Sequence, residues 1–337
     1  MNETISPEGT SVRSVSVAMA TYNGARHLSE QLASLAGQTR LPDELVVTDD
    51  GSTDGTRELI ETFARTAPFA VRLHPNEERL GVTRNFERAL SLCTGDIVFL
   101  SDQDDVWLAD KIEEVVKAFE ADPGVQIVLN DKIITDGQLV STGATMLSNI
   151  RGFGAPDSCF VAGCCAAMRA DWRKLALPIP EGMSAHDSWI VGLAHRLGSA
   201  KIVEKPLQLY RRHDSNVSQN AYSSTRRVGL VDRLRQEMKD GAGSASNPEE
   251  YWEYFLTGQA AEMKRIEEAA PLIDEMGLRA QADQALEELR SVNAATSARK
   301  EIATMGRLKR IGAIARLWSQ GGYRHFSGLK SAAKDLV

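Results

Sequence analysis

Two clusters of carboxylates stand out as residues that could do chemistry. The larger is the run Ser101-Asp102-Gln103-Asp104-Asp105, which directly follows a hydrophobic segment. Carboxylates held this close repel one another unless a counter-ion is present. A divalent cation such as Mg²⁺ or Mn²⁺ would neutralise them and leave positions open for the oxygens of a diphosphate. The alternative is a solvated acidic loop that caps a helix beginning at Asp110, and the run alone does not decide between the two.

The second cluster, Asp49-Asp50-Gly51-Ser52, follows another apolar segment. Asp, Gly and Ser are common turn residues, so a simple turn is one interpretation. The other is recognition of a nucleotide, because a carboxylate accepts hydrogen bonds from a base edge or a ribose hydroxyl. No glycine-rich dinucleotide fingerprint and no P-loop accompanies the cluster, which argues against both of those classes of nucleotide-binding protein.

Strand-like and helix-like segments alternate through the first 130 or so residues, as expected for βαβ units. The expected strands are 15–19, 44–48, 69–74, 96–100 and 125–129, and the expected helices are 27–36, 56–64, 82–92 and 110–121. This order predicts an α/β fold with a mostly parallel sheet. Ligands of such sheets bind beyond the carboxyl ends of the strands. Both acidic clusters lie at that edge, so we treat them as one site.

Beyond residue 150 the pattern is less regular. We expect a strand within 158–169, a helix over 187–197 and a strand over 201–212. Cys164 and Cys165 should point to opposite faces of the first of these strands as buried thiols. A linker of small residues at 241–247 precedes a helical region that starts at Pro248 and continues to about Trp318.

Composition excludes several classes of protein. The chain has 337 residues and a formal net charge of −7, which argues against a nucleic-acid-binding protein. The four cysteines lack the spacing of a zinc site or a disulfide framework. The N-terminal residues have no apolar core, and no run of 18 apolar residues occurs. We therefore expect a cytoplasmic protein.

Three motifs together resemble the family 2 glycosyltransferases of the GT-A fold. They are residues 15–24 (VSVAMATYNG), residues 47–56 (VTDDGSTDGT) and residues 99–105 (FLSDQDD). The resemblance covers roughly residues 13 to 220. It implies a catalytic domain over 13–222 followed by a helical region over 223–337. The segment Tyr210-Arg211-Arg212-His213, with Asn216 and Val217 after it, resembles the bacterial rhamnosyltransferase-like branch.

The resemblance also implies roles for individual residues in binding a nucleotide-sugar donor. Asp104 matches the metal-binding aspartate, Asp102 matches the ribose-side acid, and Asp105 is expected to support them. Asp50 matches the acceptor for a pyrimidine imide N–H. For Arg84, a salt bridge with Glu87 is the alternative. The remaining donor-binding candidates are Ala20, Thr21, Tyr22, Asn23, Arg79, Asn85, Gln103 and Arg212.

Asp187 matches the position of the catalytic base of the family. An inverting transfer needs a carboxylate beside the acceptor hydroxyl. Many relatives have Glu-Asp here, whereas this chain has His186 before Asp187, so only one carboxylate is available. His186 and Trp189 could shape the acceptor or sugar pocket, although Trp189 more often belongs to a core. His213 is a candidate third ligand of the metal or a contact to the diphosphate.

The C-terminal segment is basic, in contrast to the rest of the chain. Residues 300–337 hold eight Lys and Arg against two acids, a formal +6. Basic and apolar residues are interspersed from Met305 to Trp318, a pattern typical of helices that lie on anionic membrane surfaces. The alternative is a helix that packs on the catalytic domain with a solvated basic face. The helical segment 248–297 could mediate homodimerisation.

Taken together, the sequence predicts an inverting glycosyltransferase that requires Mn²⁺ or Mg²⁺. The donor would be a UDP- or dTDP-sugar, with rhamnose as first choice on the resemblance alone. The acceptor would be a hydroxyl of a bacterial cell-surface glycan, including a lipid-linked one at the inner face of the membrane. Two alternatives stay open. One is a phosphotransfer enzyme built on Asp49 and Asp50, and the other is a non-catalytic scaffold that binds a sugar nucleotide.

Overall fold

The computed structural model describes residues 13–183, 185–213, 221–229, 232 and 248–336. The chain divides into two compact units, Met1–Gly229 and Leu230–Val337. Asn216 and Val217 of the rhamnosyltransferase-like segment and the small-residue linker 241–247 lie outside the described residues. Each unit is described by itself below.

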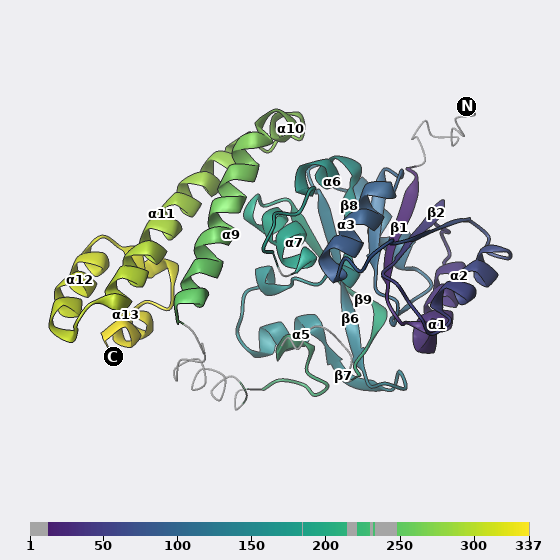
Figure 1. Cartoon of the computed structure of the whole chain (residues 1–337), viewed down its shortest axis with the longest axis horizontal. Coiled ribbons are helices and arrows are strands. Elements are labelled where there is room, and N and C mark those ends of the chain that lie inside the picture. The colour runs from purple at the N-terminus through teal and green to yellow at the C-terminus, as the bar shows by residue number, and fades with distance from the viewer. Residues whose placement is uncertain (1–12, 184, 214–220, 230–231, 233–247, 337) are drawn as a thin grey trace. The chain divides into compact units, whose positions relative to one another are not determined.

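The first unit is built on one nine-stranded sheet with the order β3-β2-β1-β4-β8-β6-β9-β5, and β7 pairs with β6 (Figure 1). The strands are β1 (Val15–Thr21), β2 (Glu44–Asp49), β3 (Ala70–Pro75), β4 (Ile97–Ser101), β5 (Val106–Trp107), β6 (Ile127–Thr135), β7 (Ser141–Thr145), β8 (Ala166–Arg169) and β9 (Ala200–Arg211). β3, β2, β1 and β4 are parallel. β8 is antiparallel to both β4 and β6, and β9 is parallel to β6. The predicted mostly parallel α/β sheet is confirmed.

Helices cover both faces of the sheet. They are α1 (Ala25–Ala36), α2 (Thr56–Ala64), α3 (Val82–Leu92), α4 (Lys111–Glu120), α5 (Met146–Gly152), α6 (Ala170–Ala176) and α7 (His186–Arg196), with 3-10 turns at Asp157–Cys159, Gly163–Cys165 and Ala221–Ser223. Because strand residues alternate between faces, Val15, Val17 and Met19 pack in one core cluster with the apolar sides of α1, α2 and α4. α3 contacts β1 and β2 and also packs on α7. The core therefore fixes the strand ends on which the acidic loops are carried.

The carboxyl ends of six strands meet at one edge of the sheet. β1, β2, β3, β4, β6 and β9 run in the same direction, as their pairings require. The segments that follow β1, β2, β4 and β9 therefore emerge on the same side, at Tyr22, Asp50, Asp102 and Arg212. This is the edge at which open α/β sheets bind ligands.

Two local expectations are wrong. Cys164 and Cys165 do not lie on a strand, because Gly163–Cys165 forms a 3-10 turn and the strand begins only at Ala166. Both thiols are nevertheless buried, as is Cys93, while Cys159 is half-buried. Small residues before Ala166 permit this tight turn, which a two-residue periodicity does not reveal. The suggested helix cap is also absent, since the side chain of Asp110 makes no capping hydrogen bond to α4.

The second unit is helical. Its elements are α9 (Pro248–Glu268), α10 (Ala270–Glu275), α11 (Arg279–Thr304), α12 (Arg307–Ser319), a 3-10 turn at Gly322–His325, and α13 (Leu329–Leu336). A small core joins α11, α12 and α13. Beside it, Arg299 makes a bidentate ion pair with Asp335, with both N–O distances 2.8 Å, and the hydroxyl of Tyr323 donates to the same carboxylate. Among the described helices of both units, none has the length and apolarity to cross a bilayer.

Candidate active site

Asp104 and His213 come together at the carboxyl edge of the sheet. Asp104 lies in the loop after β4, and His213 follows β9. Oδ2 of Asp104 is 2.8 Å from Nε2 of His213. The ring of His213 also stacks on His27 of α1, with centroids 5.3 Å apart. Two of the predicted metal-site residues therefore present their ligand atoms to the same small volume, and His27 is a neighbour to which the sequence assigned no role.

The other two aspartates of the acidic loop lie deeper. Asp105 is fully buried, accepts a hydrogen bond of 2.8 Å from Nε2 of Gln208, and lies 3.3 Å from the backbone N of Arg211. Burial raises the pKa of Asp105 well above its usual range, and the neighbouring acids add to this. Burial, with the charges of Asp104 and Asp187, raises the pKa of Asp102 to about 7. Burial and mutual repulsion therefore disfavour the ionised forms of these two carboxyl groups, and a bound cation would favour them.

A buried lysine supplies positive charge beside the acidic loop. Lys132 of β6 is buried, with its Nζ 3.8 Å from Sγ of Cys164 and 3.4 Å from the centroid of the Tyr210 ring. Burial alone lowers the pKa of Lys132, but the acidic groups around it, Cys164 first and Asp105 among them, raise it overall. A buried ammonium beside buried carboxyl groups partly compensates their charge. Nothing in the local sequence around Lys132 signals this placement.

Two groups of side chains could hold a divalent metal. In one, the carboxylates of Asp102 and Asp105 and the sulfur of Cys164 lie within 4.8 Å of one another. A hydrogen bond with Cys165 and burial raise the pKa of the Cys164 thiol far above its ordinary value. Because the thiolate is the form that binds metals, this group does not fit Mg²⁺ or Mn²⁺. The carboxylate and imidazole of Asp104 and His213 do fit, since both atoms converge and both side chains are partly exposed.

Gln103 joins the acidic loop to the end of β1. Its Oε1 accepts from the backbone N–H of Tyr22 at 3.0 Å, and its Nε2 donates to the backbone O of Tyr22 at 3.1 Å. A Cβ on Gly24 would lie 2.2 Å from Oε1 of Gln103, so this amide needs a glycine at position 24. The guanidinium of Arg79 lies over the ring of Tyr22, 4.1 Å from the ring centroid. Three predicted donor-binding residues are thus neighbours.

Asp50 and Asn85 belong to one hydrogen-bonded network. Asp50 is buried and accepts from Nδ2 of Asn76 (2.8 Å) and from the backbone N–H groups of Leu80 (2.7 Å) and Gly81 (2.9 Å). Nδ2 of Asn76 also donates to Oδ1 of Asn85. Nδ2 of Asn85 in turn lies within hydrogen-bonding distance of the carbonyls at the ends of β1 and β2. The network holds the segment that carries Arg79 against the edge of the sheet.

Asp49, by contrast, is a structural carboxylate. It is fully buried and accepts hydrogen bonds from the hydroxyl of Thr21, from the backbone N–H and the hydroxyl of Ser52, and from Nε of Arg57. Burial by itself raises the pKa of Asp49, but the hydrogen bonds from Ser52 and Arg57 lower it overall. A carboxylate enclosed by four donor groups has no free approach for a phosphorus atom, which removes the nucleophile that a phosphotransfer enzyme would need. Thr21 serves the same cluster, and the Asn23 side chain accepts from the backbone N–H of Thr53 at 2.9 Å.

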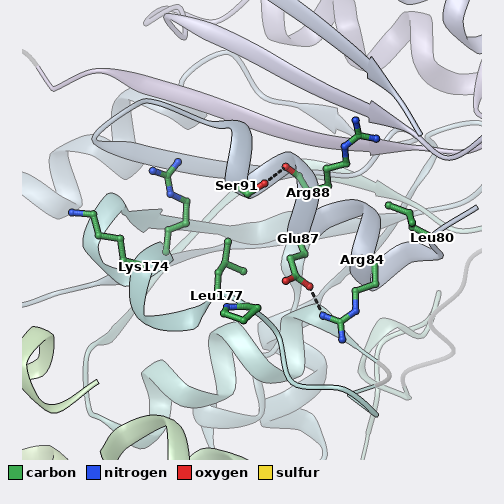
Figure 2. Close-up of a pocket in the computed structure, with 9 residues that line it drawn as sticks. Leu80, Arg84, Glu87, Arg88, Ser91, Lys174 and Leu177 are labelled. Atoms are coloured by element: carbon green, nitrogen blue, oxygen red, sulfur yellow. Dashed lines mark hydrogen bonds and ion pairs between the residues drawn. The ribbon is translucent and has the colours of Figure 1, made fainter. Parts of the chain in front are cut away.

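Arg84 lies in a pocket of about 720 Å³ between α3, α6 and the segment that follows α6. Arg84 and Glu87 point toward one another and form an ion pair, and Arg84 also donates to the carbonyl of Ile179 at 2.7 Å (Figure 2). The salt bridge that the sequence offered as an alternative is therefore present. The polar contacts that the structure gives Arg84 are with Glu87 and Ile179 and not with the acidic loop.

Asp187 stands in the first turn of α7. Its Oδ1 accepts from the backbone N–H of Ser188 at 2.8 Å, and its Oδ2 lies 3.4 Å from the backbone N of Gly163. The side chain is half-buried, and its charge contributes to the raised pKa of Asp102. The long crossover between β8 and β9 thus returns Asp187 to the neighbourhood of the acidic loop. Trp189, two residues after Asp187, is buried, and its Nε1 donates to the carbonyl of Ala176 at 2.8 Å. It is a core residue.

His186 packs beside Asp187. Its ring stacks on Phe86 with centroids 4.2 Å apart, and its Nε2 lies buried against Gly163 with no hydrogen-bond partner. Burial lowers the pKa of His186, while the charge of Asp187 acts in the opposite direction. A neutral imidazole therefore stands at position 186, where many relatives have a glutamate.

Residues 16–174 match the model of glycosyl transferase family 2, which spans the two acidic clusters and the strands that carry them. This unit is a family 2 glycosyltransferase domain.

Two relatives illustrate the membership. The glycosyltransferase is 28% identical over 241 residues to an uncharacterized glycosyltransferase of Nostoc sp., covering 68% of this chain and 71% of the relative. It is 27% identical over 235 residues to the dTDP-rhamnosyl transferase RfbG of Shigella flexneri, covering 63% of this chain and 78% of the relative. The expected enzyme class, a glycosyltransferase, is confirmed.

The fold of the glycosyltransferase is also found in solved structures. The crystal structure of S. aureus TarS 1–349 in complex with UDP-GlcNAc has a TM-score of 0.55 at 17% identity, covering 96% of this chain and 88% of that chain. The same protein in complex with UDP has a TM-score of 0.52. At this identity the likeness shows the fold alone, and it confirms the expected GT-A architecture.

Several residues of the glycosyltransferase site were not found by sequence reasoning. Lys132, Cys164 and Gln208 meet the acidic loop from β6, the 3-10 turn before β8, and β9. Arg211 is buried, and its Nε donates to the backbone carbonyl of Asp104 at 2.9 Å. Arg212 follows it, half-buried, with its backbone N–H bonded to the carbonyl of Thr135. The local sequence gave no signal for Lys132 or Gln208, because β6 also carries Asn130 and Asp131 and β9 also carries Lys201, Glu204 and Lys205.

Proposed function

We propose that this protein is an inverting, metal-dependent glycosyltransferase that moves a sugar from a UDP- or dTDP-linked donor to a hydroxyl of a bacterial cell-surface glycan. The observation that carries the proposal is the 2.8 Å contact between Asp104 and His213 at the edge of the sheet that also holds Asp50. Rhamnose is the first choice of sugar, supported by the segment Tyr210-Arg211-Arg212-His213 and by the 27% identity to a dTDP-rhamnosyl transferase.

The nucleoside would be held at the ends of β1 and β2. A carboxylate offers about four lone-pair positions, and three donors already occupy Asp50, so its Oδ2 retains one for the imide N–H of a pyrimidine. Tyr22 and Arg79 offer stacking surfaces for the base. Ala20 lies at the same strand end, and Asp102 is proposed to accept from the ribose. Arg84 is also proposed to contact the donor, with its Nη1 paired to Glu87.

The diphosphate would lie beside Asp104. We assign Asp104 and His213 as the residues that hold Mn²⁺ or Mg²⁺, and Arg212 as a contact to phosphate oxygens. When bound, the cation supplies charge stabilisation to the departing diphosphate. Two buried residues hold the loop in place: Gln208 donates to the carboxylate of Asp105, and Arg211 donates to the backbone carbonyl of Asp104.

Asp187 is proposed as the general base. Its carboxylate takes the proton of the acceptor hydroxyl while the hydroxyl oxygen forms a bond to the anomeric carbon. The bond from that carbon to the diphosphate breaks, and its electron pair leaves on the phosphate oxygen. Because attack and departure occur on opposite faces of the sugar, the anomeric configuration inverts.

The acceptor is proposed to be a glycan or lipid-linked glycan, which would place the enzyme in the cytoplasm at the inner face of the membrane. The helices at 248–297 are proposed as the dimer contact. Both proposals rest on the helical second unit and not on the residues of the transfer site.

The test is release of nucleoside diphosphate from a panel of UDP- and dTDP-sugars by the full-length protein, with Mn²⁺, with Mg²⁺ and with EDTA. We expect one donor class to be hydrolysed slowly in the presence of metal, and Asp104→Ala to abolish the release. The same donors should raise the melting temperature, since a ligand that binds the folded state stabilises it. If no donor is hydrolysed and none shifts the melting temperature with either metal, the proposal is wrong.

A further inference from the structure

Helix α12 exposes an apolar stripe to solvent (Figure 1 shows the helix near the C-terminal end of the chain). Leu308 is 89% exposed, Ile311 56% and Trp318 47%. Gly312 and Ala315 are exposed as well. These positions follow the spacing i, i+3, i+4, i+7 and i+10, which places them on one side of a helix of about 3.6 residues per turn. The stripe is continuous along the whole helix.

The opposite side of α12 is what holds the helix in its unit. Leu317 is buried in the small core of the second unit, and Ala313 and Ile314 pack against that core. Arg310 also turns inward, with Nε bonded to the carbonyl of Met305 and a terminal nitrogen bonded to that of Ala303, both at 2.9 Å. The apolar stripe is therefore not needed for packing within the unit. A helix with a second apolar face requires another explanation.

Basic residues flank the stripe. Lys309 and Arg316 lie along one border of it and Arg307 along the other, by the same helical geometry, and all three are exposed. α12 contains no acidic residue, and residues 300–337 carry a formal +6 in a chain of −7. The flanking charges would repel one another less on a surface that carries negative charge. Trp318 has the amphipathic ring that favours the boundary between head groups and acyl chains.

We propose that α12 docks the protein on an anionic membrane surface, with Leu308, Ile311 and Trp318 inserted at the level of the head groups and the three cations contacting anionic lipids. Charge complementarity selects this occupant, because an acidic lipid surface matches cations on both borders of an apolar stripe. The proposal goes beyond sugar transfer and does not depend on it. The alternative, a helix with a solvated basic face, does not fit α12, because the exposed face of this helix is mainly apolar.

The experiment is co-sedimentation of the full-length protein with vesicles of phosphatidylcholine alone and of phosphatidylcholine with phosphatidylglycerol. Binding is expected to the anionic vesicles only, and to weaken as salt is raised. The double variant Leu308→Ser/Ile311→Ser and the double variant Lys309→Glu/Arg316→Glu should each reduce partitioning by about tenfold or more. All four positions are exposed, so the circular dichroism spectrum and melting temperature should not change.

Two control variants test whether the same types of substitution affect vesicle binding when they lie outside α12. Val140→Ser changes an apolar side chain of the first unit that is 62% exposed, and Lys264→Glu reverses a charge on α9. Both should bind vesicles like the wild type. Equal binding to neutral and anionic vesicles, no binding to either, or normal binding by both stripe variants overturns the proposal. A concentration-dependent dimer in analytical ultracentrifugation that Leu308→Ser/Ile311→Ser abolishes would assign the stripe to a second copy of this chain instead.

Discussion

Asp104 and His213 are separated by 109 residues in the chain, yet their side chains meet at 2.8 Å. One follows β4 and the other follows β9, and the sheet directs both strands toward the same edge. β5 begins directly after the acidic loop and pairs antiparallel with β9, with Val106 opposite Leu209. The contact therefore depends on this pairing across the sheet rather than on either loop alone.

The first prediction concerns this pair. Asp104→Asn and His213→Ala should each weaken binding of Mn²⁺ in the presence of a nucleoside diphosphate by about tenfold or more, because each removes one of two converging ligand atoms. Mn²⁺ binding can be followed by electron paramagnetic resonance. His325→Ala in the second unit serves as the control, since the ring of His325 contacts Ser291 there. Unchanged Mn²⁺ affinity in His213→Ala would remove that histidine from the metal site.

The second prediction concerns Gly24 and Gln103. A methyl group at position 24 would collide with Oε1 of Gln103, so Gly24→Ala should release the two hydrogen bonds that fasten the acidic loop to Tyr22. Each such bond contributes about 1 kcal/mol, so nucleotide affinity measured by calorimetry should fall by about tenfold. Gln103→Ala should have a similar effect, and the double variant should be little worse than either single one.

A matched glycine controls for the general effect of this substitution. Gly258 lies within α9, where a Cβ meets nothing within 4 Å. Gly258→Ala should stabilise the protein, because alanine favours a helix by about 0.5–1 kcal/mol. Nucleotide affinity in this variant should not change. A loss of affinity in Gly258→Ala equal to that in Gly24→Ala would show that the effect does not arise at Gln103.

The third prediction concerns Asp187. Asp187→Asn keeps the shape of the side chain but removes its ability to accept a proton, so the rate of sugar transfer should fall by about 10²–10⁴-fold. Affinity for the nucleoside diphosphate should stay close to that of the wild type. Asp171→Asn is the control, because that carboxylate is exposed and pairs only with Lys174 among its described contacts. Full transfer activity in Asp187→Asn would show that another group takes the proton.

The fourth prediction is a dependence of stability on pH. Burial lowers the pKa of His186 from its ordinary value of 6.5, with partial opposition from Asp187. As the pH falls below about 6.5 the unfolded chain takes up this proton before the folded one does, so stability that is present above that pH is lost toward acid. His27, His74 and His325 have lowered pKa values as well and add to the loss.

The variant His186→Leu isolates one share of this effect. It keeps an apolar contact with Phe86 but removes one titrating group. Below pH 6.5 its melting temperature should fall less steeply with decreasing pH than that of the wild type. The difference corresponds to a slope of up to about 1.4 kcal/mol per pH unit in the free energy of unfolding. An identical slope below pH 6.5 would mean that His186 is not held neutral in the folded protein.

Local sequence was sufficient for much of the fold. The strands that end at Thr21, Asp49 and Ser101 were found from short apolar runs followed by polar turns, and the helices between them from apolar spacing. The ion pair of Arg84 with Glu87, which the sequence offered only as the alternative to donor binding, forms because residues three apart face each other on a helix. Cys164 and Cys165 were misplaced because a 3-10 turn of small residues has no distinctive periodicity.

The sequence by itself determined that acidic turns follow parallel strands, because strand, turn and helix each depend on neighbouring residues. It thereby placed Asp50, Asp102 and Asp104 at one edge. Only the tertiary structure decided what meets them there: His213 against Asp104, Gln103 against Tyr22, and the buried Lys132 near Asp105. The physical reason is that these contacts depend on strand order and register, which are set by packing of the whole core.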